Sequence, residues 1–495
     1  MTENLLPDMF AGIWPYQKKL LPSFFVFLAS GIAAIAIQQP LLVLFPFAWI
    51  LAPVVFEIVV AAPEKIFWLL LIVLPLSTEL NLTPELGFDF PDEVLLVLLT
   101  GIVSVKMIHQ PLWIPDALKQ HPLFMWLLIY TCWILVTCIY SVEPLLSVKY
   151  LLAKTWYIIP LVILPQVLLT SQSSIQKMAL CLLIPMLLVV IQTLARHSLY
   201  QFSFENVKKT LAPFFRNHVN YSSMLVCLIP IAWCVWKLTP VDHLKRKWLV
   251  YGLLIGFVGL FFAYSRGAWI ALLLGFSAIW LIQKKLMGAM VLLAITAITV
   301  STLWLVTDKK YMEFAPDHDR TVFHTDFSEH MRATVEMKDV STAERFYRWV
   351  AGVRMFADKP VTGFGPNSFN THYRPYTVGR FATWVSGNPE HSTVHNYFIL
   401  TALEQGVPGL ILFCVLYFGM LLRAQKLYHQ LQSRFYRTIA LTVAIVLIMI
   451  GVINSLSDMI ETDKIGALFW LCLGMIILLD TKSREEKEAV ANVEF

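Results

Sequence analysis

Long apolar stretches recur along this chain, and they constrain its fold more than any other feature. A helix of about 20 apolar residues matches the thickness of a lipid bilayer, and within a bilayer only helices and closed barrels satisfy their own backbone hydrogen bonds. The sequence therefore predicts an all-α, polytopic integral membrane protein with about 12 to 14 transmembrane helices. The candidate spans lie near residues 20–38, 40–61, 65–81, 93–108, 122–141, 147–170, 175–196, 219–237, 248–264, 266–283, 286–306, 396–422, 436–456 and 464–480.

Composition excludes a soluble globular protein. Charged residues make up 14% of the chain, against about 25% in soluble domains. The seven cysteines all fall in apolar segments and form no CxxC pair. We interpret them as small apolar core residues rather than as disulfides or metal ligands.

The distribution of lysine and arginine predicts the orientation in the membrane, because cytoplasmic loops carry an excess of both. The short loops near residue 39, 82–92 and 457–463 have neither. We therefore expect both termini in the cytoplasm. The loops expected inside carry Lys18, Lys19, Lys106, Lys119, Lys245, Arg246, Lys247, Lys284, Lys285, Arg423, Lys426, Arg434, Arg437, Lys482 and Arg484.

The alternation of apolar spans and polar segments divides the chain into five parts. These are N-terminal helices over 1–210, further helices over 211–306, a long outer segment over 307–395, C-terminal helices over 396–480 and a tail over 481–495. The outer segment contains an amphipathic pattern in which Phe346, Trp349 and Val353 recur on one face. Arg345 and Arg348 are expected on the opposite, polar face, and such a helix suits a membrane surface.

His395 is the strongest candidate for a catalytic residue, since it stands at the start of an apolar helix. Ser392 or Thr393 can cap that helix, which would place His395 in its first turn. The positive end of the helix dipole disfavours a charged imidazole there, so the ring should stay neutral, as a general base must. The structural alternative is a histidine that caps the helix or contacts water. His391 can support His395 or contact a substrate, although a structural role is favoured for it.

Several arginines predict an anion-binding site on the outer side. Arg266 lies between two spans with almost no loop, where it either faces a cavity or reaches the lipid headgroups. The guanidinium fork of Arg345 or Arg348 suits phosphate oxygens, with attraction to lipid phosphates as the alternative. Arg216 belongs to the one basic short outer loop, beside Lys208 and Lys209. Asn217, His218 and Asn220 follow it and are candidates for the same anion site.

Other polar residues give weaker signals. Glu404 lies within a span and must meet water, a donor or a cation, and a structural hydrogen bond is favoured over catalysis. His318, His324 and His330 stand near aspartates, but their spacing matches no familiar metal site. The chain has no P-loop and no dinucleotide fingerprint. We therefore expect no metal, no cofactor and no nucleic-acid partner.

Taken together, these motifs resemble the O-antigen ligase and polymerase superfamily over roughly residues 210 to 425. The most specific part is His395-Asn396 followed by Leu400, Glu404, Gly406 and Gly409. The other matching elements are Arg216-Asn217-His218-Val219-Asn220-Tyr221, Ser265-Arg266-Gly267, Glu344-Arg345 with Trp349, and Gly363-Phe364-Gly365-Pro366-Asn367-Ser368-Phe369.

The resemblance implies an enzyme that moves a glycan from an undecaprenyl-pyrophosphate-linked donor to a hydroxyl group at the periplasmic face. It implies that Arg266 and Arg345 hold the pyrophosphate and that His395 deprotonates the acceptor, with Asn396 beside it. In ligases the acceptor is a sugar of the lipid A core. A polymerase, whose acceptor is another lipid-linked repeat, and a protein O-oligosaccharyltransferase remain alternatives. A transporter of the same lipid would need charges near the midplane on symmetric, broken helices, and Lys154 and Glu57 form no such pair.

Overall fold

The computed structural model describes residues 25–30, 63–83, 86–314, 340–383, 386–388 and 392–492. Contacts divide the chain into one unit over 1–66 and a second over 67–495. In the first unit, residues 25–30 are helical. The remainder of the spans expected at 20–38 and 40–61 lies outside the described residues. His391 and the three histidines 318, 324 and 330 also lie outside them.

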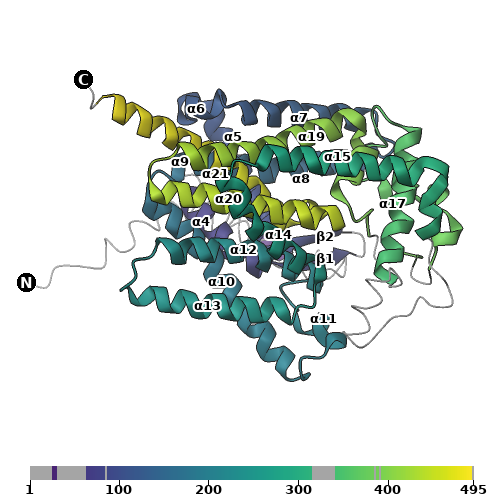
Figure 1. Ribbon diagram of the computed structural model, residues 1–495, viewed down its shortest axis with the longest axis horizontal. Coiled ribbons are helices and arrows are strands. Elements are labelled where there is room, and N and C mark those ends of the chain that lie inside the picture. The colour runs from purple at the N-terminus through teal and green to yellow at the C-terminus, as the bar shows by residue number, and fades with distance from the viewer. Residues whose placement is uncertain are drawn as a thin grey trace, which may run out of the picture. The chain divides into compact units, whose positions relative to one another are not determined.

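Helices dominate the described part of the chain (Figure 1). The long ones are α4 (Pro63–Val73), α5 (Asp92–His109), α7 (Pro122–Ile139), α8 (Pro144–Ile158), α10 (Gln172–Ser198), α12 (His218–Leu238), α13 (Leu244–Phe261), α14 (Arg266–Gln283), α15 (Met287–Val306), α17 (Val340–Asp358), α19 (Tyr397–Gln430), α20 (Arg434–Leu456) and α21 (Asp463–Ala491). The short ones are α6 (Asp116–Lys119), α9 (Leu164–Leu168), α11 (Val207–Thr210) and α18 (Phe369–His372), together with short turns such as η9 (Met459–Glu461).

Nine helices in the described residues are long and apolar enough to cross a membrane. They are α7, the continuous stretch from α8 to α9, α10, α12, α14, α15, α19, α20 and α21. The protein is therefore an all-α, multi-pass membrane protein, as the sequence predicts. The expected spans at 93–108 and 248–264 are also helical and correspond to α5 and α13. Each of these two helices contains three charged residues, so neither is among the nine.

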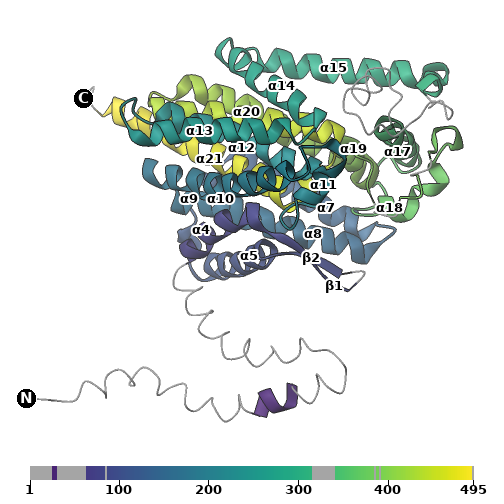
Figure 2. The same ribbon diagram turned by 90° about the horizontal axis from the view of Figure 1, so that it is seen from below.

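The span expected at 65–81 is wrong in its second half. Helix α4 ends at Val73, a short turn carries the chain to Leu76, and strand β1 (Thr78–Thr83) follows. Pro75 cannot continue the helix, because it lacks a backbone N–H and clashes with the preceding turn. Strand β1 pairs antiparallel with β2 (Leu86–Phe90), so that Thr78 lies opposite Phe90. This hairpin leads directly into α5 (Figure 2).

Helix α20 forms the centre of the second unit, because α14, α19, α12 and α21 all pack against it. Its residues from Thr438 to Ile450 are almost completely buried. Gly275 of α14 faces Met449 with no room for a side chain, which lets the two helices approach closely. The end of α20 at Leu456 and the start of α21 at Asp463 are joined by a short loop containing η9. The candidate site is built around this loop.

Helix α17 packs against the first part of α19 (Figure 1). The sequence-based assignment of its faces is wrong for Arg348, which was expected on an exposed polar face. Glu344 and Arg348 are each 6% exposed, and Ala351 and Met355 continue the buried stripe. Val353, from the expected apolar face, is exposed. The reason is that Arg348 has polar partners inside the protein, so its burial leaves few hydrogen bonds unmade.

Candidate active site

His395 immediately precedes the cap of α19. The side-chain oxygen of Asn396 accepts hydrogen bonds from the backbone N–H groups of Phe398 and Ile399, both at 3.0 Å. Its amide nitrogen donates to the carbonyl of Ser455 at 2.9 Å, which ties the start of α19 to the end of α20. The expected cap at Ser392 or Thr393 is therefore wrong, and His395 lies one residue before the cap rather than in the first helical turn. Its φ of 54° is left-handed, a conformation that costs a non-glycine residue energy.

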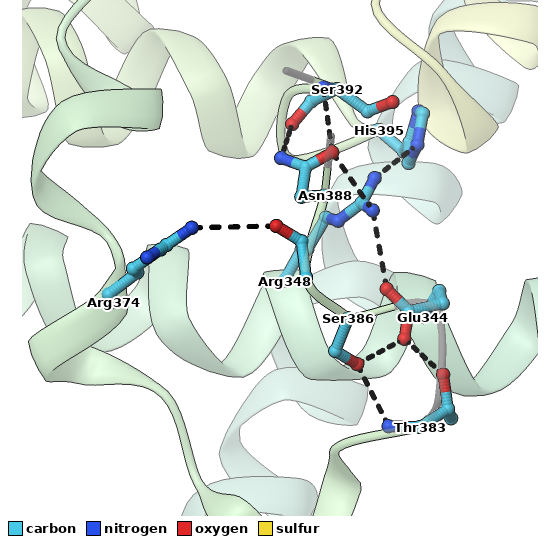
Figure 3. A network of polar contacts seen from close by, with 9 residues as sticks. Glu344, Arg348, Arg374, Thr383, Ser386, Asn388, Ser392 and His395 are labelled. Carbon is cyan, nitrogen blue, oxygen red and sulfur yellow. Dashed lines mark hydrogen bonds and ion pairs between the residues drawn. The ribbon is translucent and has the colours of Figure 1, made fainter. Parts of the chain in front are cut away.

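The imidazole of His395 faces a guanidinium group (Figure 3). Its Nε2 atom lies 2.7 Å from Nη1 of Arg348. Arginine only donates hydrogen bonds, so Nε2 must accept, and the proton of the neutral ring is on Nδ1. Burial lowers the pKa of His395 to about 3, and the Arg348 and Arg345 charges act in the same direction. The ring is therefore neutral near pH 7, for reasons of tertiary contact rather than of the helix dipole.

A chain of hydrogen bonds holds Arg348 in place (Figure 3). Its Nη2 atom donates to Oε2 of Glu344 at 3.2 Å and to the side-chain oxygen of Asn388 at 3.4 Å. The other oxygen of Glu344 accepts from the hydroxyls of Thr383 and Ser386. The Nε atom of Arg348 is buried without a hydrogen-bond partner among the described residues. The guanidinium group is thus fixed at the imidazole but incompletely satisfied.

The other side of the ring faces a carboxylate. Nδ1 of His395 lies 3.9 Å from Oδ1 of Asp458, which is longer than a hydrogen bond. The second oxygen of Asp458 accepts from the hydroxyl of Thr393. Burial raises the pKa of Asp458 to about 6, and the Glu461 carboxylate contributes in the same direction. At pH 7 Asp458 is therefore mostly ionised and favours the tautomer that carries its proton on Nδ1.

The end of α20 brings the predicted arginines into the same region. Nε of Arg345 donates to the carbonyl of Leu456 at 3.2 Å. Arg266 is the first residue of α14, and a side chain on the following Gly267 would contact Leu456 at 3.5 Å. His395, Arg345 and the start of α14 thus converge on the last residues of α20, although they are far apart in the sequence. The neutral imidazole of His395 therefore lies near the charges of Arg345 and Arg348.

Glu404 has structural partners. It is 3% exposed, and its Oε1 atom accepts from the backbone N–H groups of Ser368 and Phe369, at 3.1 and 3.3 Å. It lies beside a kink at Gly406, whose φ is 70°. The motif Gly363-Phe364-Gly365 is bound to this kink through its backbone, because Phe364 and Gly365 donate to the carbonyls of residues 403 and 404 at 2.9 Å. The carboxylate and the glycines therefore join the segment between α17 and α19 to α19.

The residues of the basic loop lie elsewhere. Asn217 caps α12, since its side-chain oxygen accepts from the backbone N–H of Asn220 at 2.9 Å. Arg216 and Asn220 line a cavity of about 780 Å³ that is bounded by the start of α21 and by the β1–β2 hairpin. His395 is not part of its lining. The structure therefore separates these three residues from the group around His395.

Three residues of this region, Asp458, Glu344 and Lys154, were not predicted as site residues. Glu344 lies four residues before Arg348 on one helix, a spacing that favours an ion pair and that could have identified it from the sequence. Lys154 is 3% exposed, and its ammonium group donates to Glu461 at 2.8 Å and to the hydroxyl of Tyr397 at 3.2 Å. A lysine within a span needs such a partner, but the sequence alone does not reveal which one.

The comparison with known protein families locates a domain in this region. Residues 251–414 match the family described as O-antigen ligase. The match covers α14, α17 and the first half of α19, with Arg266, Arg345, Arg348 and His395, and it stops before Asp458. A search of curated proteins finds no match. Residues 251–414 are therefore similar to the O-antigen ligase family, and this similarity points to a membrane enzyme that transfers glycosyl groups.

Proposed function

We propose that this protein is an O-antigen ligase. It transfers a glycan from an undecaprenyl-pyrophosphate donor to a hydroxyl group of the lipid A core, at the periplasmic face of the bacterial inner membrane. The observation that carries the proposal is the neutral imidazole of His395, with its Nε2 lone pair directed at a cluster of cations. A base beside cations suits a reaction that deprotonates a hydroxyl group and releases a pyrophosphate.

His395 is the general base of this reaction. The acceptor hydroxyl replaces the N–H of Arg348 at Nε2 and transfers its proton there. The acceptor oxygen forms a bond to the anomeric carbon, while the bond from that carbon to the pyrophosphate oxygen breaks and its electron pair leaves with the pyrophosphate. A single displacement of this kind inverts the anomeric configuration. Asp458 stabilises the imidazolium that forms, because it faces Nδ1.

Arg266 and Arg345 bind the pyrophosphate. Their planar guanidinium groups match pairs of phosphate oxygens, and fixed cations stabilise the negative charge that grows on the leaving group. Arg348, displaced from the imidazole by the acceptor, turns its N–H toward the same charge. The donor carries its own leaving group, so the reaction needs no nucleotide.

Reconstitution with separate acceptors tests this proposal. The purified protein is placed in liposomes with a lipid-linked donor, and either lipid A core or a second lipid-linked repeat is offered. We expect transfer to lipid A core alone, and a loss of about 10²-fold or more in His395→Ala. The matched control is His109→Ala, since His109 is exposed at the end of α5. Extension of the lipid-linked repeat instead would identify a polymerase, and a correctly folded protein that extends neither acceptor would refute the proposal.

A further inference from the structure

The cavity that contains Arg216 and Asn220 has no role in the reaction described so far. Its volume is about 780 Å³, which is within the range of ligand-binding pockets. Its wall combines segments that are distant in the sequence: the β2 strand with the start of α5, the residue Lys149 of α8, the loop over 208–216 and the start of α21. A cavity assembled from so many segments forms only in the folded protein.

The cavity lies at the same end of the helices as His395. The loop between α20 and α21 contributes to both places: Asp458 faces the imidazole, and Glu461 lines the cavity. Three residues of extended chain span at most about 11 Å, so this wall is close to the proposed base. Glu461 is fixed, because it accepts from Lys154 at 2.8 Å and from the hydroxyl of Tyr150 at 3.0 Å. A large substrate bound at His395 can therefore extend into the cavity.

The charges of the lining exclude a simple anion site. The lining contains both acidic and basic side chains, so that neither sign predominates. The carboxylates are those of Glu79, Asp89, Glu93, Glu461 and Asp463, and the cations are those of Lys149, Lys208, Arg216 and Lys464. A phosphate would be repelled by the carboxylates. A metal ion also fits poorly, because no group of three potential ligand side chains gathers anywhere in the described part of the chain.

A neutral polyhydroxylated molecule matches this lining. Each sugar hydroxyl both donates and accepts a hydrogen bond, so it can use a carboxylate and a cation side by side. Phe88, Phe214 and Phe215 add aromatic surface, against which the C–H face of a sugar ring can pack. The inner wall is preorganised, since the ammonium group of Lys464 donates to Ser77 Oγ at 2.9 Å and to the carbonyl of Phe214 at 3.0 Å. Such a fixed set of donors and acceptors discriminates between hydroxyl patterns.

We propose that this cavity is a saccharide-binding subsite, which holds sugar residues of one substrate while its reacting end lies at His395. Its assignment to a substrate rests on the proposed function. Two sources provide the same chemistry, the glycan of the donor and the core oligosaccharide of the acceptor. Lys149, Lys208 and Arg216 are exposed, and they form the entrance through which either glycan reaches the fixed inner wall.

Binding of lipid-free sugars to the full-length protein in detergent tests this inference without catalysis. The two probes are the O-antigen polysaccharide and the core oligosaccharide, each freed of its lipid, and binding is measured by saturation-transfer NMR and calorimetry. The variants are Asp89→Asn and Lys149→Gln. The matched controls are Asp242→Asn and Lys284→Gln, two exposed positions in loops outside the cavity lining. His395→Ala is included because it removes the proposed base and leaves the cavity intact.

We expect one of the two sugars to bind about tenfold more weakly to both cavity variants, with unchanged binding to the controls and to His395→Ala. The sugar that is affected identifies the donor or the acceptor as the ligand. The inference is overturned if neither sugar binds, if the cavity variants bind both sugars like the wild type, or if inorganic pyrophosphate displaces the sugar. Since His395→Ala keeps the subsite, a failure of the transfer reaction and a failure of sugar binding remain distinguishable.

Discussion

Two sets of histidine, aspartate and arginine occupy different places in this protein, and their difference separates a structural cluster from the one that we propose to be catalytic. In the first, Nε2 of His121 lies 2.8 Å from Asp480, and Nε of Arg423 donates to the same carboxylate at 2.9 Å. The side chains of His121 and Asp480 are 2% and 4% exposed. The carboxylate of Asp480 is at the centre of this set, because both His121 and Arg423 form hydrogen bonds with it.

In the second set the imidazole is at the centre. His395 contacts Arg348 at 2.7 Å, while Asp458 lies 3.9 Å away. The side chain of His395 is 31% exposed. Here a cation faces the lone pair of the ring, and a carboxylate stabilises its N–H side without a direct bond. The same three residue types therefore join α7, α19 and α21 in the first set, whereas in the second set they surround a partly exposed imidazole.

The largest expected effect comes from removing the histidine of each set. His395→Ala should reduce glycan transfer by about 10²- to 10⁴-fold, the usual contribution of a general base. His121→Ala should lower thermal stability but keep the rate per folded molecule. Initial rates in liposomes, normalised to folded protein, provide the comparison. If His395→Ala kept more than a tenth of the wild-type rate, His395 would not be the base.

The next effect concerns the two arginines that we propose to bind the pyrophosphate. Arg345→Lys and Arg266→Lys should each lose most of the activity, about tenfold or more, because an ammonium group cannot bind two phosphate oxygens in the fork geometry. Arg423→Lys should instead affect stability and leave the rate of transfer unchanged. Rates measured at several donor concentrations test this difference. Equal turnover in the wild type and both lysine variants would remove the pyrophosphate assignment.

A change in pH dependence should follow from Arg348→Met. The pKa of His395 is lowered to about 3 by burial and by the nearby arginine charges, so removing Arg348 raises it toward its ordinary value of about 6.5. The acidic limb of the pH–rate profile then moves to higher pH, because the lone pair is protonated earlier. In the wild type, this histidine also makes folding less favourable as pH falls from about 6.5 toward 3, since the unfolded chain binds the proton more readily.

The Arg348→Met variant should lose less stability than the wild type as the pH falls from about 6.5 toward 3. The checks are the pH–rate profile and the melting temperature as a function of pH, with Arg374→Met as the matched substitution. Arg374 is exposed and contacts neither His395 nor Glu344. Coincident profiles for Arg348→Met and the wild type would show that Arg348 has no electrostatic influence on the base.

The smallest effect on transfer is expected from Asp480→Asn. Loss of one partner from a buried, paired cluster costs about 3 to 5 kcal/mol of stability, because Arg423 loses its counter-charge. The rate per folded molecule should stay at the wild-type value, since this cluster is remote from the end of α20. Thermal unfolding and normalised transfer rates measure the two quantities. A selective loss of transfer with unchanged stability would mean that the two sets are coupled.

The amino-acid sequence by itself determined the membrane helices and the chemical types at the site. Lengths of apolar sequence are local properties, so α10, α12 and α20 follow from them directly. The choice of His395, Arg266 and Arg345 as candidates also required only residue types in an unusual apolar setting. The wrong prediction for residues 65–81 also has a local explanation. Pro75 ends α4, and the residues after it form strand β1, which pairs with the nearby strand β2.

Only the tertiary structure decided which atoms of these residues meet. Asn396 rather than Ser392 or Thr393 caps α19, because its amide also reaches the end of α20. Arg348 is buried rather than exposed, because it contacts His395. The sequence pattern does not show this contact, since the two residues are 47 positions apart. A periodic pattern specifies the face on which a side chain lies, but contacts between distant segments determine the tautomer and the pKa of His395. Local sequence does not encode those contacts, since their energies arise only when the helices pack.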